Sequence, residues 1–212
     1  MFSHDRAWFE RHPLMVAYDL LGTTLTVRRD GTVTGGRIVE VEAYAGPNDL
    51  ASHSGKNRAG RAALIREPGR LYIYRSYGIH TMLNVVAHVA GEAGGVLFRA
   101  LEPQTGEEEM RARRGERARH LASGPGSLCQ AMGLRLDDDG TDVMDSEWLH
   151  LAVTARNDAA VAGPRIGISK GLSVSWRLFD TESTHVSVHR RGFRVTFDDL
   201  EGMIPPVGTI IG

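Results

Sequence analysis

The sequence predicts a single α+β domain built on a mainly antiparallel β-sheet. Its 212 residues suit one domain whose core is large enough to be stable without disulfides. Three strand-like runs, Arg37–Tyr44, Leu71–Tyr77 and Gly95–Leu101, are separated by turns and short helical segments. Because the chain has neither an internal repeat nor a linker-like segment, we assign residues 1–212 to one mixed domain.

The first of these runs, RIVEVEAY, alternates apolar and polar side chains with a period of two. We expect one face of this strand to bury Val39, Val41 and Ala43. The other face then presents Glu40, Glu42 and Tyr44. The third run is apolar except for Arg99, and a buried guanidinium needs an anionic partner. An acid-bearing strand, an arginine-bearing strand and the tyrosine-rich run LYIYRSY together indicate a functional site.

Short helices and further strands complete the predicted domain. The expected helical segments are a short helix capped by Ser3 and running to Glu10, then Leu14–Leu21, one turn at Arg61–Arg66, Glu107–His120, and a short helix between Gly124 and Gly133. The other expected strands are Thr23–Val27, Leu83–Val89, Leu149–Val153, Arg165–Ile168, Trp176–Phe179 and Val186–Val188. Asp30-Gly31-Thr32 predicts a turn that leads to the acid-bearing strand.

Composition excludes several classes of protein. No apolar run approaches membrane-spanning length, so we expect no membrane partner. The N-terminus lacks the layout of a signal peptide, which makes a cytoplasmic location the default expectation. The single Cys129 excludes an internal disulfide and a cysteine-built metal site.

Basic residues are unevenly distributed, although the net charge is only -1. Residues 51–80 contain one acid, Glu67, and six cations: Lys56, Arg58, Arg61, Arg66, Arg70 and Arg75. Because this segment lies within the suspected site, we interpret it as a track for phosphate groups. A second basic cluster at residues 111–119 is better interpreted as a solvated face.

The sequence also lacks the motifs of several chemistries. It contains no Walker A motif, no dinucleotide-binding G-x-G-x-x-G and no H-E-x-x-H. The spacing G-x-S-x-G occurs at Gly167–Gly171, but no expected helix follows it, so we expect no nucleophile elbow. It also lacks the H-x-E and P-C-x-x-C pair of zinc deaminases. One carboxylate, an arginine, an asparagine, a histidine and several tyrosines remain. That set suits hydrolysis by an activated water inside an aromatic pocket.

Five ordered blocks resemble one enzyme family, the alkyladenine (3-methyladenine) DNA glycosylases. The blocks are IVEVEAYAGPNDLASHS, PGRLYIYRSYGIHTMLNVV, GVLFRALEP, GPGSLCQAMGL and PRIGI, and the resemblance runs from about Leu20 to Val188. It implies a mixed α/β domain around a curved, mainly antiparallel sheet with flanking helices. It also implies an enzyme that uses neither a metal nor another cofactor.

The resemblance assigns catalytic roles to three residues. Glu42 matches the general base that directs a water to the sugar C1′, a suitable role for a carboxylate because the sugar gains oxocarbenium character. The alternative for Glu42 is a solvent-facing strand residue. Arg99 matches the residue that holds the water and the nucleotide's phosphate, a role compatible with a core ion pair. The Ile166 carbonyl matches a further water ligand, whereas Glu40 is interpreted as structural.

The resemblance also assigns the walls of a pocket for a flipped base. Tyr44, His53 and Tyr74 match stacking residues, and Tyr77 matches the wedge that fills the gap left in the duplex. Asn84 matches a gatekeeper that crowds the amino group of guanine, and the amides of Ala51 and His53 match readers of the purine edge. Each of these aromatic residues taken alone is more often ordinary packing, and Tyr77 alone is compatible with a turn.

Two departures from the family pattern affect contacts with DNA. The run GKNRAGRAALIRE after Ser54 is shorter than the usual element, and Arg75 and Ser76 replace apolar or aromatic residues. We expect Arg75, Lys56 and Arg58 to contact phosphates.

The sequence therefore predicts a monomeric, monofunctional DNA glycosylase acting on double-stranded DNA that contains damaged purines. The expected substrates are 3-methyladenine and 7-methylguanine, extending to hypoxanthine and ethenoadenine. A lyase step needs an amine nucleophile, and no lysine stands at a matched catalytic position. Two alternatives remain: a non-catalytic protein that flips and holds damaged bases, and a hydrolase of free nucleosides.

Overall fold

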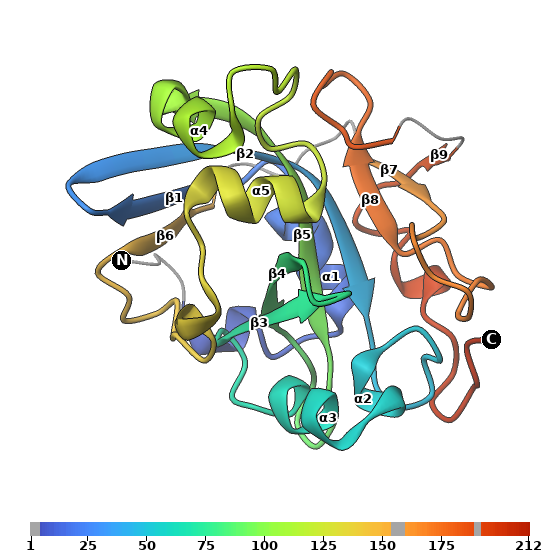
Figure 1. Ribbon diagram of the computed structural model, residues 1–212. Helices are drawn as coiled ribbons and strands as arrows, with labels where there is room; N and C mark the ends of the chain where they lie inside the picture. The colour runs from blue at the N-terminus through green and yellow to red at the C-terminus, as the bar shows by residue number, and fades with distance from the viewer. Residues whose placement is uncertain (1–4, 154–159, 189–191) are drawn as a thin grey trace.

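The computed structural model describes residues 5–153, 160–188 and 192–212 (Figure 1). Among these residues one large sheet has the strand order β3-β4-β5-β2-β8-β7-β9, with β1 beside β2 and β6 beside β1. All of its pairings are antiparallel. The strands are β1 (Thr24–Arg29), β2 (Thr32–Tyr44), β3 (Leu71–Ser76), β4 (His80–Val86), β5 (Gly95–Thr105), β6 (Leu149–Ala152), β7 (Ala160–Gly163), β8 (Arg177–Asp180) and β9 (Phe193–Arg194). The predicted α+β class with a mainly antiparallel sheet is confirmed.

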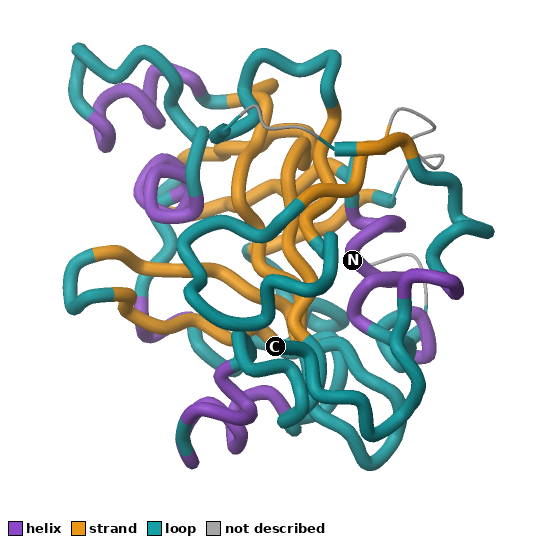
Figure 2. The backbone as a smooth tube through the Cα atoms, turned by 90° about the vertical axis from the view of Figure 1, so that its right-hand side faces the viewer, coloured by secondary structure: helices purple, strands orange, loops and turns teal. Residues whose placement is uncertain are grey.

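The helices cover both faces of this sheet. They are α1 (Pro13–Leu20), α2 (His53–Lys56), α3 (Arg58–Leu64), α4 (Glu107–Arg114) and α5 (Pro125–Met132), with 3-10 turns η1 (Arg6–Trp8), η2 (Leu136–Asp138) and η3 (Glu201–Met203). Both α1 and α5 pack against β5, and Figures 1 and 2 place them on opposite sides of it. No described helix has the length and apolar character needed to cross a membrane.

Strand β2 organises the sheet. One of its edges pairs with β5, and the other pairs first with β1 and then with β8. The register with β5 shifts at Gly35/Gly36, Ile38/Glu40 and Glu40/Val41, and such bulges bend a strand and increase its twist. The predicted common face of Val39, Val41 and Ala43 is therefore wrong. Val41 and Ala43 belong to the main core, whereas Val39 packs in a separate cluster with Phe179.

The β3–β4 hairpin projects from the sheet and ends in a tight turn (Figure 2). Tyr77 and Gly78 have φ angles of 50° and 69°, and the Ile79 N–H donates to the Ser76 carbonyl over 3.0 Å. These values define a type I′ turn, whose twist matches that of the flanking strands. The turn fixes Tyr77 in a left-handed conformation that is unusual for a bulky residue.

Several predicted elements need correction. Arg165–Ile168 and Val186–Val188 are irregular, not strands, because the Ile166 and Ser187 N–H groups donate to the carboxylates of Glu42 and Glu40 instead of to a neighbouring strand. The helix predicted to reach His120 ends at Arg114, since Gly115 has a φ of 88°. The predicted cap Ser3 lies outside the described residues.

Candidate active site

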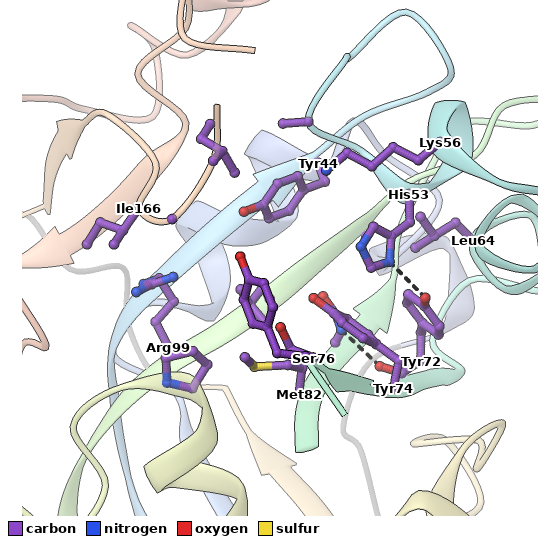
Figure 3. A pocket seen from close by; sticks show the side chains of 18 residues that line it. Tyr44, His53, Lys56, Leu64, Tyr72, Tyr74, Ser76, Met82, Arg99 and Ile166 are labelled. Atoms are coloured by element: carbon purple, nitrogen blue, oxygen red, sulfur yellow. Dashed lines mark hydrogen bonds between the residues drawn. The ribbon is translucent and has the colours of Figure 1, made fainter. Parts of the chain in front are cut away.

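A cavity of about 370 Å³ opens between the β3–β4 hairpin, β2, β5, α2 and the loop after β7 (Figure 3). Nine residues singled out from the sequence line it: Tyr44, Ala51, His53, Lys56, Tyr74, Tyr77, Asn84, Arg99 and Ile166. Glu42 is fully buried and contacts three of these lining residues, so it lies directly behind the wall. Arg58 and Arg75 do not line the cavity.

The Glu42 carboxylate accepts three hydrogen bonds. Its Oε1 accepts from the Ile166 N–H over 2.7 Å. Its Oε2 accepts from the Tyr44 hydroxyl over 2.7 Å and from Arg99 Nη1 over 3.1 Å. A carboxylate offers about four lone-pair sites, so these donors satisfy the buried group and leave room for one more donor such as a water. Ile166 thus contacts Glu42 through its N–H, while the expected role of its carbonyl as a water ligand stays a prediction.

Arg99 bridges two carboxylates. Its Nε donates to Glu40 Oε1 over 3.1 Å, while Nη1 reaches Glu42. Glu40 in turn accepts from Arg177 Nε over 2.6 Å. Burial opposes the charge on Glu40, but Arg99 and Arg177 outweigh it and lower the pKa of that carboxyl. The core ion pair expected for Arg99 is therefore present, and Arg99 also lines the cavity.

Tyr44 is fixed on both its hydroxyl and its ring. Burial, together with the adjacent Glu42, raises the pKa of Tyr44 well above its ordinary range, so its hydroxyl remains a donor. The Arg165 guanidinium lies over the Tyr44 ring at 4.7 Å from the centroid. Arg165 itself forms a fully buried bidentate pair with Asp49, at 2.6 and 2.8 Å. This pair joins the loop after β2 to the loop after β7.

His53, Tyr72 and Tyr74 form an aromatic wall. The ring of Tyr74 lies 4.6 Å from that of His53 at 62° and stacks at 5.2 Å on Tyr72. His53 Nδ1 is 2.9 Å from the Tyr72 hydroxyl (Figure 3). Burial raises the pKa of Tyr72 and of Tyr74 to about 12, so both hydroxyls stay protonated at neutral pH. Burial, followed by the charge of Lys56, lowers the pKa of His53, which favours a neutral ring.

Asn84 is hydrogen-bonded within the sheet and also lines the cavity, and its role as a gatekeeper stays a prediction. It is buried, with 6% of its surface exposed, and its Nδ2 donates to the Tyr72 carbonyl over 3.0 Å. This bond is the structural role of an amide inside the sheet. The same side chain lines the cavity, where a gatekeeper has to lie.

The Ala51 amide already has a partner. Its N–H donates to Asp49 Oδ1 over 3.0 Å, and the same oxygen accepts a hydrogen bond from Arg165. The expectation that this amide reads the purine edge therefore requires sharing or release of that bond.

The mouth of the cavity is apolar at the hairpin tip and basic at its side. Tyr77 is 88% exposed and Ile79 is 74% exposed. Large apolar side chains exposed together are typical of a binding surface. Lys56 and Arg58 lie exposed at α2 and α3. Arg75 is exposed too, but strand alternation points it away from the face on which Tyr72, Tyr74 and Ser76 line the cavity.

Four site residues escaped the sequence reasoning: Tyr72, Asp49, Arg165 and Arg177. Tyr72 had a signal, because in LYIYRS it alternates with Tyr74 and Ser76 and so shares their face. The buried pair of Asp49 and Arg165 is separated by more than one hundred residues, and no local pattern marks it.

Comparisons with known proteins agree with this geometry. A family model described as Methylpurine-DNA glycosylase (MPG) matches residues 7–184. A relative from Chlorobaculum parvum named "Putative 3-methyladenine DNA glycosylase" is 42% identical over 191 residues, covering 87% of this chain and 90% of the relative. Relatives of the same name from Mycolicibacterium fortuitum and Rhodopseudomonas palustris (strain BisB18) are 42% and 45% identical, covering 86% and 81% of this chain and 96% and 84% of themselves.

Proposed function

Because the chain belongs to the methylpurine-DNA glycosylase family, we propose that it is a monofunctional, monomeric glycosylase that removes alkylated purines from duplex DNA. Its substrates are 3-methyladenine and 7-methylguanine, and it leaves an abasic site. The names of the relatives support the first substrate. The observation that carries the proposal is Glu42, a buried carboxylate directly behind the wall of an aromatic cavity.

Glu42 acts as the general base. It takes a proton from a water as the water attacks the sugar C1′, while the purine departs and the sugar passes through an oxocarbenium-like transition state. Arg99 faces the same space and orients the water and the nucleotide's phosphate. The Ile166 N–H and the Tyr44 hydroxyl fix the rotamer of Glu42, and such fixed geometry lowers the entropic cost of the attack.

The aromatic wall receives the flipped base. Leaving the duplex costs stacking energy, which Tyr44, His53 and Tyr74 offset by new stacking contacts. Tyr77 projects from its turn and fills the gap in the duplex, while Lys56 and Arg58 meet the phosphates. A cationic base such as 3-methyladenine is already a good leaving group. Hypoxanthine needs a donor at N7, and the Ala51 amide serves it only by sharing its bond to Asp49, so we expect slower release.

A panel of duplex oligonucleotides, each with one lesion, tests this function. Base release, detected by alkaline cleavage, is expected for 3-methyladenine and 7-methylguanine. Binding without release would favour a non-catalytic base-flipping protein, and activity restricted to free nucleosides would favour a nucleoside hydrolase.

The same panel tests the absence of a lyase step. Among the described residues, Lys56 is the only lysine that lines the cavity. Lys56 does not stand at a position that matches a catalytic residue of the family. We therefore expect no covalent adduct when the reaction is run with borohydride. A trapped adduct that disappears in Lys56→Met would overturn the monofunctional assignment.

A further inference from the structure

Four charged side chains form a continuous buried ion-pair network behind the cavity: Glu42, Arg99, Glu40 and Arg177. They are 0%, 6%, 0% and 0% exposed, respectively. Each contact between successive members is an ion pair: Glu42 to Arg99 at 3.1 Å, Arg99 to Glu40 at 3.1 Å and Glu40 to Arg177 at 2.6 Å. Three strands supply them, β2, β5 and β8, which are neighbours in the sheet.

The charges in this ion-pair network balance. Two carboxylates face two guanidiniums, and buried charges are tolerated only when they are paired and hydrogen-bonded. Glu40 Oε2 also accepts from the Ser187 N–H over 2.7 Å, and Arg177 donates to the Val188 carbonyl. Among the described residues, Glu40 is the only carboxylate that pairs with Arg177.

The position of each residue in the ion-pair network determines how its charge affects proton binding by Glu42. Arg99 touches Glu42 directly, and it divides its guanidinium between Glu42 and Glu40. If Glu40 were neutral, Glu42 alone would face two buried cations and would release its proton more readily. If Arg177 were neutral, two carboxylates would share Arg99, and Glu42 would take up a proton more readily.

We propose that Glu40 and Arg177 are positioning residues that, acting through Arg99, set how readily Glu42 accepts a proton. This inference rests on the proposed role of Glu42 as general base. It replaces the purely structural interpretation of Glu40 with an electrostatic one, in which β8 influences a reaction that it does not touch.

Other groups also face Glu42, and the substitutions proposed here leave those residues unchanged. Tyr44 from β2 and the Ile166 N–H from the loop after β7 bond to it. Tyr74 from β3 interacts with its charge. Arg165 lies behind the Tyr44 ring and is paired with Asp49.

The test is the pH profile of single-turnover release of 7-methylguanine from duplex DNA by the full chain, with the rate of uncatalysed release subtracted. We expect the acidic limb to move to lower pH in Glu40→Gln and to higher pH in Arg177→Gln, each by about one pH unit. In the double variant the ion-pair network loses one charge of each sign, so the acidic limb returns to the wild-type position.

A purely structural role of Glu40 and Arg177 would not shift the acidic limb in opposite directions in the single variants and restore it in the double variant. Limbs that stay fixed in folded single variants, or that move in the same direction, overturn the proposal. If Glu40→Gln fails to fold, as judged by circular dichroism, the comparison of Arg177→Gln with the double variant decides. Unshifted limbs in an active enzyme that Glu42→Gln inactivates would refute only this inference, whereas an inactive wild type would refute the proposed function.

Discussion

Asn84 is the residue at which a packing role and a selective role coincide. Its amide bonds to the Tyr72 carbonyl, and it also faces the cavity. We predict that Asn84→Ser gains slow release of normal guanine, because guanine, unlike adenine and hypoxanthine, carries an amino group at C2 and the smaller side chain removes the clash with it.

The ratio of guanine to 3-methyladenine release, measured beside a melting curve, checks this prediction. Loss of the Tyr72 bond should cost about 0.5–1.5 kcal/mol of stability. If stability falls while the ratio is unchanged, Asn84 is a structural amide and no gatekeeper.

His12 gives the protein a pH-dependent stability. Its Nδ1 accepts from the Leu14 N–H at the start of α1, and its ring packs edge-on against Trp176. Burial lowers the pKa of His12 from 6.5 to about 4. The unfolded chain therefore takes up this proton first, so the contribution of His12 is complete above pH 6.5 and is lost as the pH falls towards 4.

We predict that His12→Asn, which keeps a capping acceptor, flattens the decline in the free energy of unfolding between pH 6.5 and 4 by about 2–3 kcal/mol. Urea denaturation at several pH values measures it. Parallel pH dependences in the variant and the wild type would refute the prediction, whatever the absolute loss in stability.

At this scale the sequence located most of the site residues but not their partners. Glu42, Tyr44, His53 and Arg99 stand in recognisable blocks, and the structure brings them to one cavity or directly behind it. That Arg99 needs an anionic partner followed from its apolar strand, yet its sharing between two carboxylates did not. Ion pairs between distant segments depend on sheet pairing, which a local pattern does not specify.

The β3–β4 hairpin is the element that contacts the duplex in the proposed function. Its turn holds Tyr77 at a φ of 50° with 88% of its surface exposed. We predict that Tyr77→Ala weakens release from a well-paired lesion more than from a mismatched or single-stranded one, because only the paired base requires full compensation for unstacking.

Single-turnover rates on those three substrates measure the effect. Phe193→Ala is a suitable control, since Phe193 is a half-exposed aromatic on β9, at the opposite end of the sheet order from β3. Equal losses on all three substrates in Tyr77→Ala would remove the wedge role.

Among the elements, strands with regular alternation and turns with glycine were the predictable ones. Asp30-Gly31 forms the predicted turn between β1 and β2, with Arg29 opposite Thr32. The failures were the irregular segments around Ile166 and Ser187. Their amides bind buried carboxylates, and an apolar run gives no sign that its backbone hydrogen bonds go to side chains.

At the scale of the whole molecule, the site exists only because distant segments meet. Strand β2 supplies Glu42, the proposed general base, β5 supplies Arg99, and the loop after β7 supplies the Ile166 N–H. The buried pair of Asp49 and Arg165 locks two of the contributing loops together beneath Tyr44. In the proposed function this assembly presents Glu42 to a water beside a flipped base.

The decisive measurement for this role of Glu42 is single-turnover release of 3-methyladenine by Glu42→Gln, together with binding to lesion-containing DNA. The substitution keeps the shape of the side chain and removes the base, so we predict a loss of rate on the order of 100-fold or more with binding within a few-fold of wild type. Glu108→Gln, a neutralised exposed acid on α4, should leave both unchanged. Full activity in Glu42→Gln, or weakened binding with an unchanged single-turnover rate, would show that Glu42 is not the general base.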